Sequence, residues 1–190
     1  MSETLRIGCA MCGSFCTFEK AMTVLESLVG RYDLTAILSE NAAGTDTRFG
    51  KAEDHIRRLE ELTGKPVMQT ISDAERIGPG KLFDVLVIMP CTGNTLGKLA
   101  NGITDTSVTM AAKAHLRNGR PVVVAMSTND GLAASLQNVG VLMVRKGYYF
   151  VPFGQDDPVK KENSLAADLT KVEQTIQRAL EGKQLQPVIV

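Results

Sequence analysis

The sequence is poor in aromatic residues and carries no net charge. It has no tryptophan, and its 21 Lys and Arg residues balance 21 Asp and Glu residues. No overall electrostatic field therefore attracts DNA, RNA or an anionic membrane surface. No apolar run approaches the length needed to cross a bilayer, and the amino terminus lacks the basic and apolar regions of a signal peptide. We expect a cytoplasmic protein with neither nucleic acid nor membrane among its partners.

The sequence also shows no sign of a boundary between domains. The 190 residues contain no repeat, low-complexity segment or linker, and this length suits one ordinary domain, so we predict a single domain over residues 1–190. Histidine is scarce. His55 sits among charged residues of a helical pattern and His115 at the end of another, which favours structural roles for both.

Short apolar runs alternate with helical patterns along the chain. The runs predict strands at residues 5–8, 34–38, 67–68, 85–89, 122–126 and 149–151. Apolar residues at helical spacing predict helices at about residues 15–28, 56–62 and 164–180, and glycines follow as stops at positions 30, 64 and 182. We therefore predict a Rossmann-like α/β fold: a three-layer arrangement in which helices flank an open parallel sheet of about six strands. Ligands should bind at the carboxyl ends of these strands.

The loop after the first predicted strand has the composition of an anion site. Residues 8–14 open a helix whose first amide groups lack internal partners, and Gly13 and Ser14 suit a phosphate there. A tight turn with a capping serine explains the same residues equally well. The loop has no GxGxxG pattern, and Ser39 stands where an acidic residue would bind the ribose of a nicotinamide cofactor.

The loop after residues 85–89 is the most specific feature of the sequence. Pro90 is expected to end the strand and Gly93 to let the backbone turn, while Thr92, Asn94 and Thr95 offer hydrogen-bonding groups at a helix start. Such a loop suits a planar polar ligand.

This loop is similar to the Pro-x-x-x-Asn-Thr or Pro-Cys-Ser-like loop of the homo-oligomeric flavin-containing cysteine decarboxylase superfamily. Within that superfamily the chain resembles the family of dipicolinate synthase B subunits, and matching segments extend over nearly the whole chain. They are residues 45–50, 62–64, 92–94, 98–101, 110–114, 120–123, 127–130, 152–158 and 184–187.

The resemblance implies a flavin cofactor, FMN, and a partner. The phosphate is expected at Gly13, Ser14 and Ser39, and the flavin ring at residues that follow two neighbouring strands, namely Pro90, Thr92, Asn94, Thr95, Met126, Ser127 and Thr128. The chain would form a homo-oligomer and act with an A subunit that binds NADP. Together they would oxidise dihydrodipicolinate to dipicolinate during sporulation.

A dicarboxylate substrate needs cations or amide donors at both ends. The cationic candidates are Arg48, Lys98, Arg145 and Lys146, and we favour Arg48 because its planar guanidinium follows the second predicted strand. A solvated surface arginine or an intersubunit ion pair remains the alternative. Asn94 and Asn129 are expected to contact flavin or substrate, although each could instead satisfy the backbone of its own loop.

Other chemistries of the superfamily are disfavoured. Arg76 stands where cysteine decarboxylases place a catalytic histidine, and a guanidinium cannot act as a base near neutral pH. Residues 127–130 replace the Arg-Glu-Thr-Pro segment of flavin prenyltransferases, so the phosphate-binding arginine of that segment is missing. The sequence leaves open whether this chain catalyses the oxidation or supports the A subunit as a non-catalytic nucleotide-binding subunit.

Four cysteines allow a different class of function. Cys9, Cys12, Cys16 and Cys91 follow two strands that should be neighbours, so they could converge as a thiolate site for zinc or an iron-sulfur cluster. Small buried thiols at a crowded strand-to-helix turn are the simpler interpretation, and we predict no metal.

Overall fold

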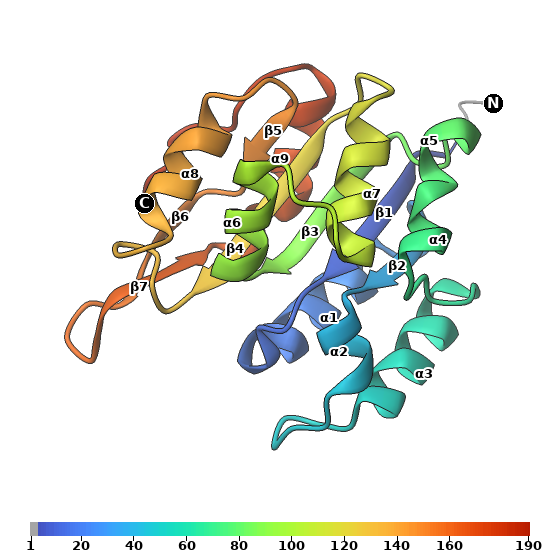
Figure 1. Cartoon of the computed structure of the whole chain (residues 1–190), viewed down its shortest axis with the longest axis horizontal. Coiled ribbons are helices and arrows are strands. Elements are labelled where there is room, and N and C mark those ends of the chain that lie inside the picture. Colours follow the sequence, from blue (N-terminus) through green and yellow to red (C-terminus); the bar gives the residue numbers. More distant parts are fainter. Residues whose placement is uncertain (1–3) are drawn as a thin grey trace.

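A mostly parallel sheet with helices on both faces forms the framework of the computed structural model, which describes residues 4–190 (Figure 1). The seven strands are β1 (Arg6–Met11), β2 (Asp33–Leu38), β3 (Val85–Cys91), β4 (Val122–Thr128), β5 (Tyr148–Phe150), β6 (Phe153–Asp157) and β7 (Lys161–Ala167). Their order is β2-β1-β3-β4-β7-β6, and β5 pairs with the start of β4. The first five strands pair in parallel, while β7 is antiparallel to β4 and β6. The α/β prediction is confirmed.

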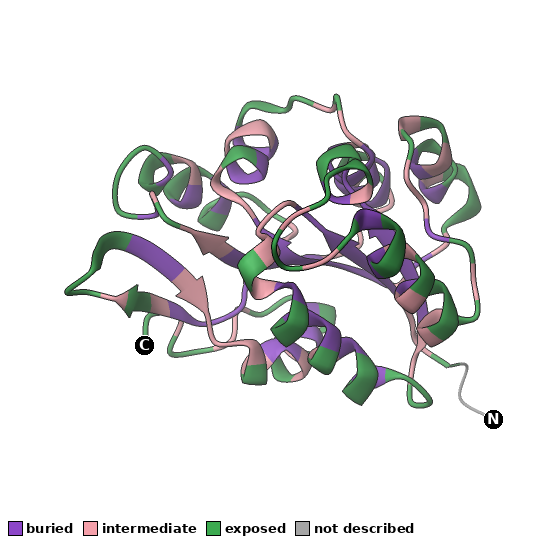
Figure 2. Ribbon diagram, turned by 90° about the horizontal axis from the view of Figure 1, so that it is seen from below, coloured by how far each residue is buried: buried purple, intermediate pink, exposed green. Residues whose placement is uncertain are grey.

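Two hydrophobic cores lie on the two faces of the sheet. One core lies under α4 (Ile71–Glu75), α5 (Ile77–Gly80), α6 (Gly93–Asn101), α7 (Ser107–Leu116) and α8 (Leu136–Met143). The other lies under α1 (Phe18–Leu28), α3 (Ala52–Thr63) and α9 (Val172–Leu180). Figure 2 shows the buried strands between helices whose outer faces are exposed. This is the predicted three-layer arrangement.

Strand geometry explains how one run of residues supplies both cores. Successive side chains of a strand point to opposite faces, so Ile7, Cys9 and Met11 enter one core and Ala10 the other. Both faces of β3 and of the start of β4 are covered, which explains why these runs are continuously apolar. Gly64 ends α3 in the left-handed conformation at φ 68°, as its sequence position indicates.

Two local predictions are wrong. Met68 forms a single bridge to Ile37 instead of a strand. Residues 164–167, expected as the start of a helix, belong to β7, which pairs with β6 at residues 153–157. Because Leu165 and Ala166 pair with the end of β4, a tertiary contact decides their conformation against the local helical pattern.

The site is positioned by the order of the strands. β1 lies between β2 and β3, so the chain crosses to one side of β1 and then returns past it to the other. Ligands of open α/β sheets bind beside the carboxyl ends of strands at such a switch point. The short helices η1 (Phe15–Thr17) and α2 (Glu40–Gly44) follow β1 and β2 at this edge. In the part of the chain that the structure describes, no helix is long and apolar enough to span a membrane.

Candidate functional site

A cavity of about 740 Å³ lies at the carboxyl ends of β1, β3 and β4. Two projecting segments also contribute to its wall: the loop between α2 and α3, and the β6–β7 hairpin (Figure 1). Of the residues that the sequence singles out for cofactor or substrate, the structure brings eight together in this wall. They are Gly13, Ser14, Arg48, Thr92, Asn94, Ser127, Thr128 and Asn129.

Hydroxyl groups of Ser14, Thr17 and Ser127 connect the loop after β1 to the end of β4. Ser14 Oγ lies 3.0 Å from Ser127 Oγ, and Thr17 Oγ1 lies 2.7 Å from the same atom. The hydroxyls of Ser14 and Thr17 are 3.4 Å apart. All three side chains line the cavity, so they offer a ligand a cluster of neutral donors and acceptors that comes from the ends of β1 and β4.

Four other residues expected at the cofactor do not line the cavity. Ser39 caps α2, its hydroxyl accepting from the Ala42 amide at 3.3 Å. Thr95 is buried and its hydroxyl lies 3.0 Å from that of Thr92, while Met126 is 1% exposed in the core. The expectation that Pro90 ends the strand is wrong: it lies within β3, after a cis peptide bond and at a shift in the register with β4.

Of the four cations considered for the substrate carboxylates, the structure places one in the cavity wall. Arg48 lines the cavity and stacks over the Phe49 ring, with its guanidinium carbon 4.8 Å from the ring centre. Lys98 pairs instead with Asp105, and Arg145 and Lys146 line another cavity of about 940 Å³ where β4 and β5 begin. That cavity is larger, but it lies away from the loops at the carboxyl ends of β1, β3 and β4, and we therefore place the site in the smaller one.

Lys20 is a second cation in the site, and sequence reasoning missed it. Neither Lys20 nor Arg48 has a carboxylate within salt-bridge distance among residues 4–190, whereas Lys161, which also lines the cavity, pairs with Asp156 at 2.7 Å. Two cations are therefore available to an anionic ligand. The signal for Lys20 was its position at the start of the helix after β1, where its side chain can reach the same edge as Ser14.

The side chains of the two asparagines do not form hydrogen bonds with the backbone of their own loops. The side chains of Asn94 and Asn129 make no hydrogen bond to any of the described residues 4–190, and both are exposed in the cavity wall. Each amide can therefore donate to and accept from a ligand.

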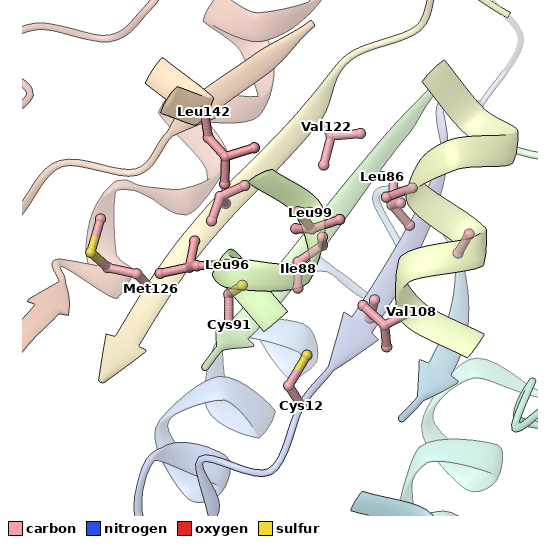
Figure 3. Close-up of a cluster of buried hydrophobic side chains, with 14 of the residues drawn as sticks. Cys12, Leu86, Ile88, Cys91, Leu96, Leu99, Val108, Val122, Met126 and Leu142 are labelled. Atoms are coloured by element: carbon pink, nitrogen blue, oxygen red, sulfur yellow. The ribbon is translucent and has the colours of Figure 1, made fainter. Parts of the chain in front are cut away.

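The four cysteines do not converge on one site, although Cys12 and Cys91 lie together. Cys9 faces the opposite side of the sheet from Cys12 and Cys91, and Cys16 is exposed. Within residues 4–190 no group of three or more His, Cys, Asp or Glu side chains could hold a metal ion. Figure 3 shows the sulfurs of Cys12 and Cys91 in the core. Burial and a hydrogen bond with Cys12 raise the pKa of Cys91, and the bond from Cys91 lowers the pKa of Cys12.

Both histidines are buried, and His55 is not on the charged face of its helix. It is buried, and its ring packs edge-on against Phe18 with the ring centres 5.0 Å apart. His115 is fully buried, with Nε2 3.1 Å from the Pro121 carbonyl oxygen. Neither lines the cavity.

Comparison with known proteins agrees with this architecture. A family model described as Flavoprotein matches residues 1–179. The B subunit of dipicolinate synthase from Bacillus subtilis (strain 168) is 45% identical over 186 residues, which cover 97% of this chain and 93% of that protein. The flavin prenyltransferase UbiX of Thermoplasma acidophilum is 29% identical over 160 residues, or 80% of this chain and 87% of that one.

A solved structure extends the similarity to three dimensions. The crystal structure of the dipicolinate synthase B subunit from Bacillus halodurans C superimposes with a TM-score of 0.89 at 41% identity, over 98% of this chain and 96% of that one. The chain therefore belongs to the flavoprotein family and, within it, to the dipicolinate synthase B subunits.

Proposed function

We propose that this chain is the flavin-binding subunit of a dipicolinate synthase. With an A subunit that binds NADP, it oxidises dihydrodipicolinate to dipicolinate during sporulation. The observation that carries the proposal is the 45% identity to a dipicolinate synthase chain of the same kind over 97% of this one. The four free thiols are compatible with a reducing compartment, and the proposal assigns the chain to the cytoplasm.

The size of the cavity supports flavin mononucleotide as its ligand. Its volume of about 740 Å³ is within the range of pockets that hold small ligands and cofactors. In the proposal the phosphate binds at Gly13 and Ser14, where the hydroxyl cluster donates to it. The ring lies against Thr92, Asn94 and Thr128. A bound flavin supplies a two-electron acceptor for a dihydropyridine ring.

The substrate carboxylates bind to cations at the same cavity. Arg48 can hold one carboxylate through two parallel N–H donors, and Lys20 adds a second positive charge without an ion-pair partner among the described residues. Asn94 and Asn129 orient the substrate ring through their side-chain amides, which have no hydrogen-bond partner among residues 4–190. These side chains bind and orient the substrate, and none of them is assigned a proton transfer.

The two related activities are disfavoured at the level of side chains. Arg76, in the place of a catalytic histidine, is exposed, pairs with Asp73 at 3.2 Å and does not line the cavity. The wall segment 127–130 contains hydroxyl, amide and carboxyl groups but no arginine that could bind a prenyl phosphate. Both observations favour oxidation over decarboxylation or prenyl transfer.

Assembly belongs to the same proposal. An apolar groove of about 450 Å³ runs along α8 and the carboxyl terminus, where Leu136, Met143 and Ile189 are exposed. Exposed apolar surface of this kind commonly mediates association. We propose a homo-oligomer, and light scattering that finds a monomer at micromolar concentration would contradict it.

Flavin binding is the first test. The purified chain is titrated with flavin mononucleotide, alongside Ser14→Ala, Asn94→Asp and, as a control outside the cavity, Asn118→Ala. We expect the first two variants to bind about tenfold more weakly, since each loses or distorts a hydrogen bond to the cofactor. If both bind as tightly as the parent chain, the assigned cavity is wrong.

The reaction is tested with the A subunit, NADP and freshly prepared dihydrodipicolinate, with dipicolinate formation as the readout. Addition of this chain should raise the yield, and Arg48→Ala should raise KM more than it lowers kcat, because a carboxylate contact stabilises substrate and transition state alike. Arg57→Ala is the control, since Arg57 pairs with Asp54 outside the cavity. Dipicolinate output that is independent of this chain would refute the synthase assignment.

A further inference from the structure

The carboxylate of Asp130 organises one wall of the cavity. Its Oδ1 accepts hydrogen bonds from two hydroxyl groups: that of Thr128 on β4, and that of Ser135 at a distance of 2.9 Å. Ser135 is 2% exposed, and its amide also donates to the Asp130 carbonyl oxygen at 3.2 Å. The carboxylate is thus fixed from the protein side, while Asp130 and Thr128 both line the cavity.

Gly93 supports the same arrangement from the neighbouring loop. It is the first residue of α6, and a Cβ at this position would lie 2.5 Å from Ser135 Oγ, 2.6 Å from Asp130 Oδ1 and 2.7 Å from Thr128 Oγ1. The glycine is therefore required by close packing against these three oxygens. The loop after β3 and the loop after β4 meet at this point.

The arrangement limits what Thr128 can offer a ligand. A hydroxyl group has one proton, and an ionised carboxylate can only accept, so the Thr128 proton is committed to Asp130. The Asp130 amide lies 3.4 Å from Thr128 Oγ1 and takes up one acceptor direction at most. What remains toward the cavity is a lone pair, so a ligand atom that contacts Thr128 Oγ1 must be a hydrogen-bond donor.

We propose that Asp130 is a positioning residue that makes Thr128 the acceptor for the imide N–H of the flavin ring. This inference rests on the proposed function. The oxidised isoalloxazine ring carries several acceptor atoms but a single N–H, the imide N3–H, so an acceptor-only hydroxyl selects that edge of the ring. The negative charge of Asp130 also disfavours a substrate carboxylate at this wall, which leaves the carboxylates to Arg48 and Lys20.

The test compares flavin mononucleotide with its N3-methyl derivative, which lacks the N–H, by titration of the purified chain. The parent chain should bind the natural flavin about 10–100-fold more tightly, because a site built to bind an N–H penalises the analogue that lacks it. In Thr128→Val, which keeps the side-chain volume, this ratio should fall to about one. A ratio that persists in Thr128→Val would show that the methyl group is excluded by size alone, and would overturn the inference.

Two further variants separate positioning from a purely structural role. Asp130→Ala removes the acceptor and frees the Thr128 hydroxyl to donate or to accept, so the ratio should fall, but less far than in Thr128→Val. Asp130→Asn keeps an oxygen at Oδ1 and should restore most of the ratio. Asp73→Ala is the matched control, because Asp73 accepts from the Thr70 hydroxyl at 2.8 Å outside the cavity and its loss should leave the ratio unchanged.

Failure of the inference can be distinguished from failure of the proposed function. If the folded parent chain binds neither flavin, the proposed cofactor is wrong. If it binds both flavins equally, the cofactor assignment stands and the role of Thr128 and Asp130 is refuted.

Discussion

Acidification is expected to destabilise the protein through His115. The ring is fully buried, Nε2 lies 3.1 Å from the Pro121 carbonyl oxygen, and Nδ1 has no hydrogen-bond partner in residues 4–190. Burial lowers the pKa of His115 from 6.5 to about 4, against the opposing effect of the hydrogen bond to the Pro121 carbonyl; the charge of Arg120 lowers this pKa further and that of Asp84 raises it slightly. A proton on Nδ1 would place an unpaired charge in the core.

The sign and size of the effect follow from linkage. Between pH 6.5 and about pH 4 the unfolded chain has taken up the proton and the folded chain has not, so stability falls as the pH falls through this window. From these two pKa values, the free energy of unfolding should be about 2 kcal/mol lower at pH 5 than at pH 8 because of this residue.

Urea unfolding at pH 8 and pH 5 measures this difference. His115→Gln is the matched variant, since its amide can donate to the Pro121 carbonyl but does not titrate. Carboxylates that lose stability in acid do so in both proteins, so the parent chain minus the variant isolates the histidine. If parent and variant lose the same free energy between the two pH values, His115 is not buried in its neutral form and the reasoning is refuted.

Two further predictions concern the thiols and the glycines. Cys16 is exposed while Cys9, Cys12 and Cys91 are at most 3% exposed, and burial raises the pKa of Cys9 to about 12, so a colorimetric thiol reagent should modify one cysteine rapidly in the native protein and all four after unfolding. Rapid reaction of two or more native thiols would contradict this. Gly8→Ala should lower the free energy of unfolding by about 1–3 kcal/mol, because its Cβ would lie 2.5 Å from the Phe83 ring. Gly140→Ala lies in the interior of α8, where the new Cβ would contact no other part of the protein within 4 Å, so it should raise the free energy of unfolding by about 1 kcal/mol. Denaturant titrations measure both variants. If both change the free energy of unfolding by the same amount, the packing described at Gly8 is wrong.

The parallel strands could be predicted from the sequence because their local apolar pattern agrees with their burial in the folded protein. The runs at 85–89 and 122–126 are apolar on both faces, which requires a covered sheet, and the structure covers both. The β6–β7 hairpin could not be predicted in this way. Its polar residues 155–157 and 161–163 carry no apolar alternation, and pairing with β4 is what makes Leu165 part of a strand.

The candidate site was predictable only at the level of loops. Ser14 and Asn94 follow β1 and β3, and Ser127 lies at the end of β4; because these strands proved to be neighbours, topology brought the three residues together. A shift of one position along the chain decides whether a side chain faces the cavity or the core, because successive side chains at a strand end point to opposite sides. Met126 lies in the core and Ser127, the next residue, in the wall.

The polar groups of the cavity can orient a ligand as well as bind it. The neutral hydroxyls of Ser14 and Thr17 suit a phosphate, whereas Thr128 Oγ1 offers only an acceptor beside the negatively charged Asp130, so the two sets of groups favour different parts of one molecule. A mononucleotide whose distal ring carries an N–H satisfies both conditions. An anionic substrate satisfies only the first, and it must compete there with the phosphate. Lys20 and Arg48, which have no ion-pair partner among residues 4–190, would provide a separate position for its carboxylates, and in the proposed arrangement cofactor and substrate occupy one cavity together.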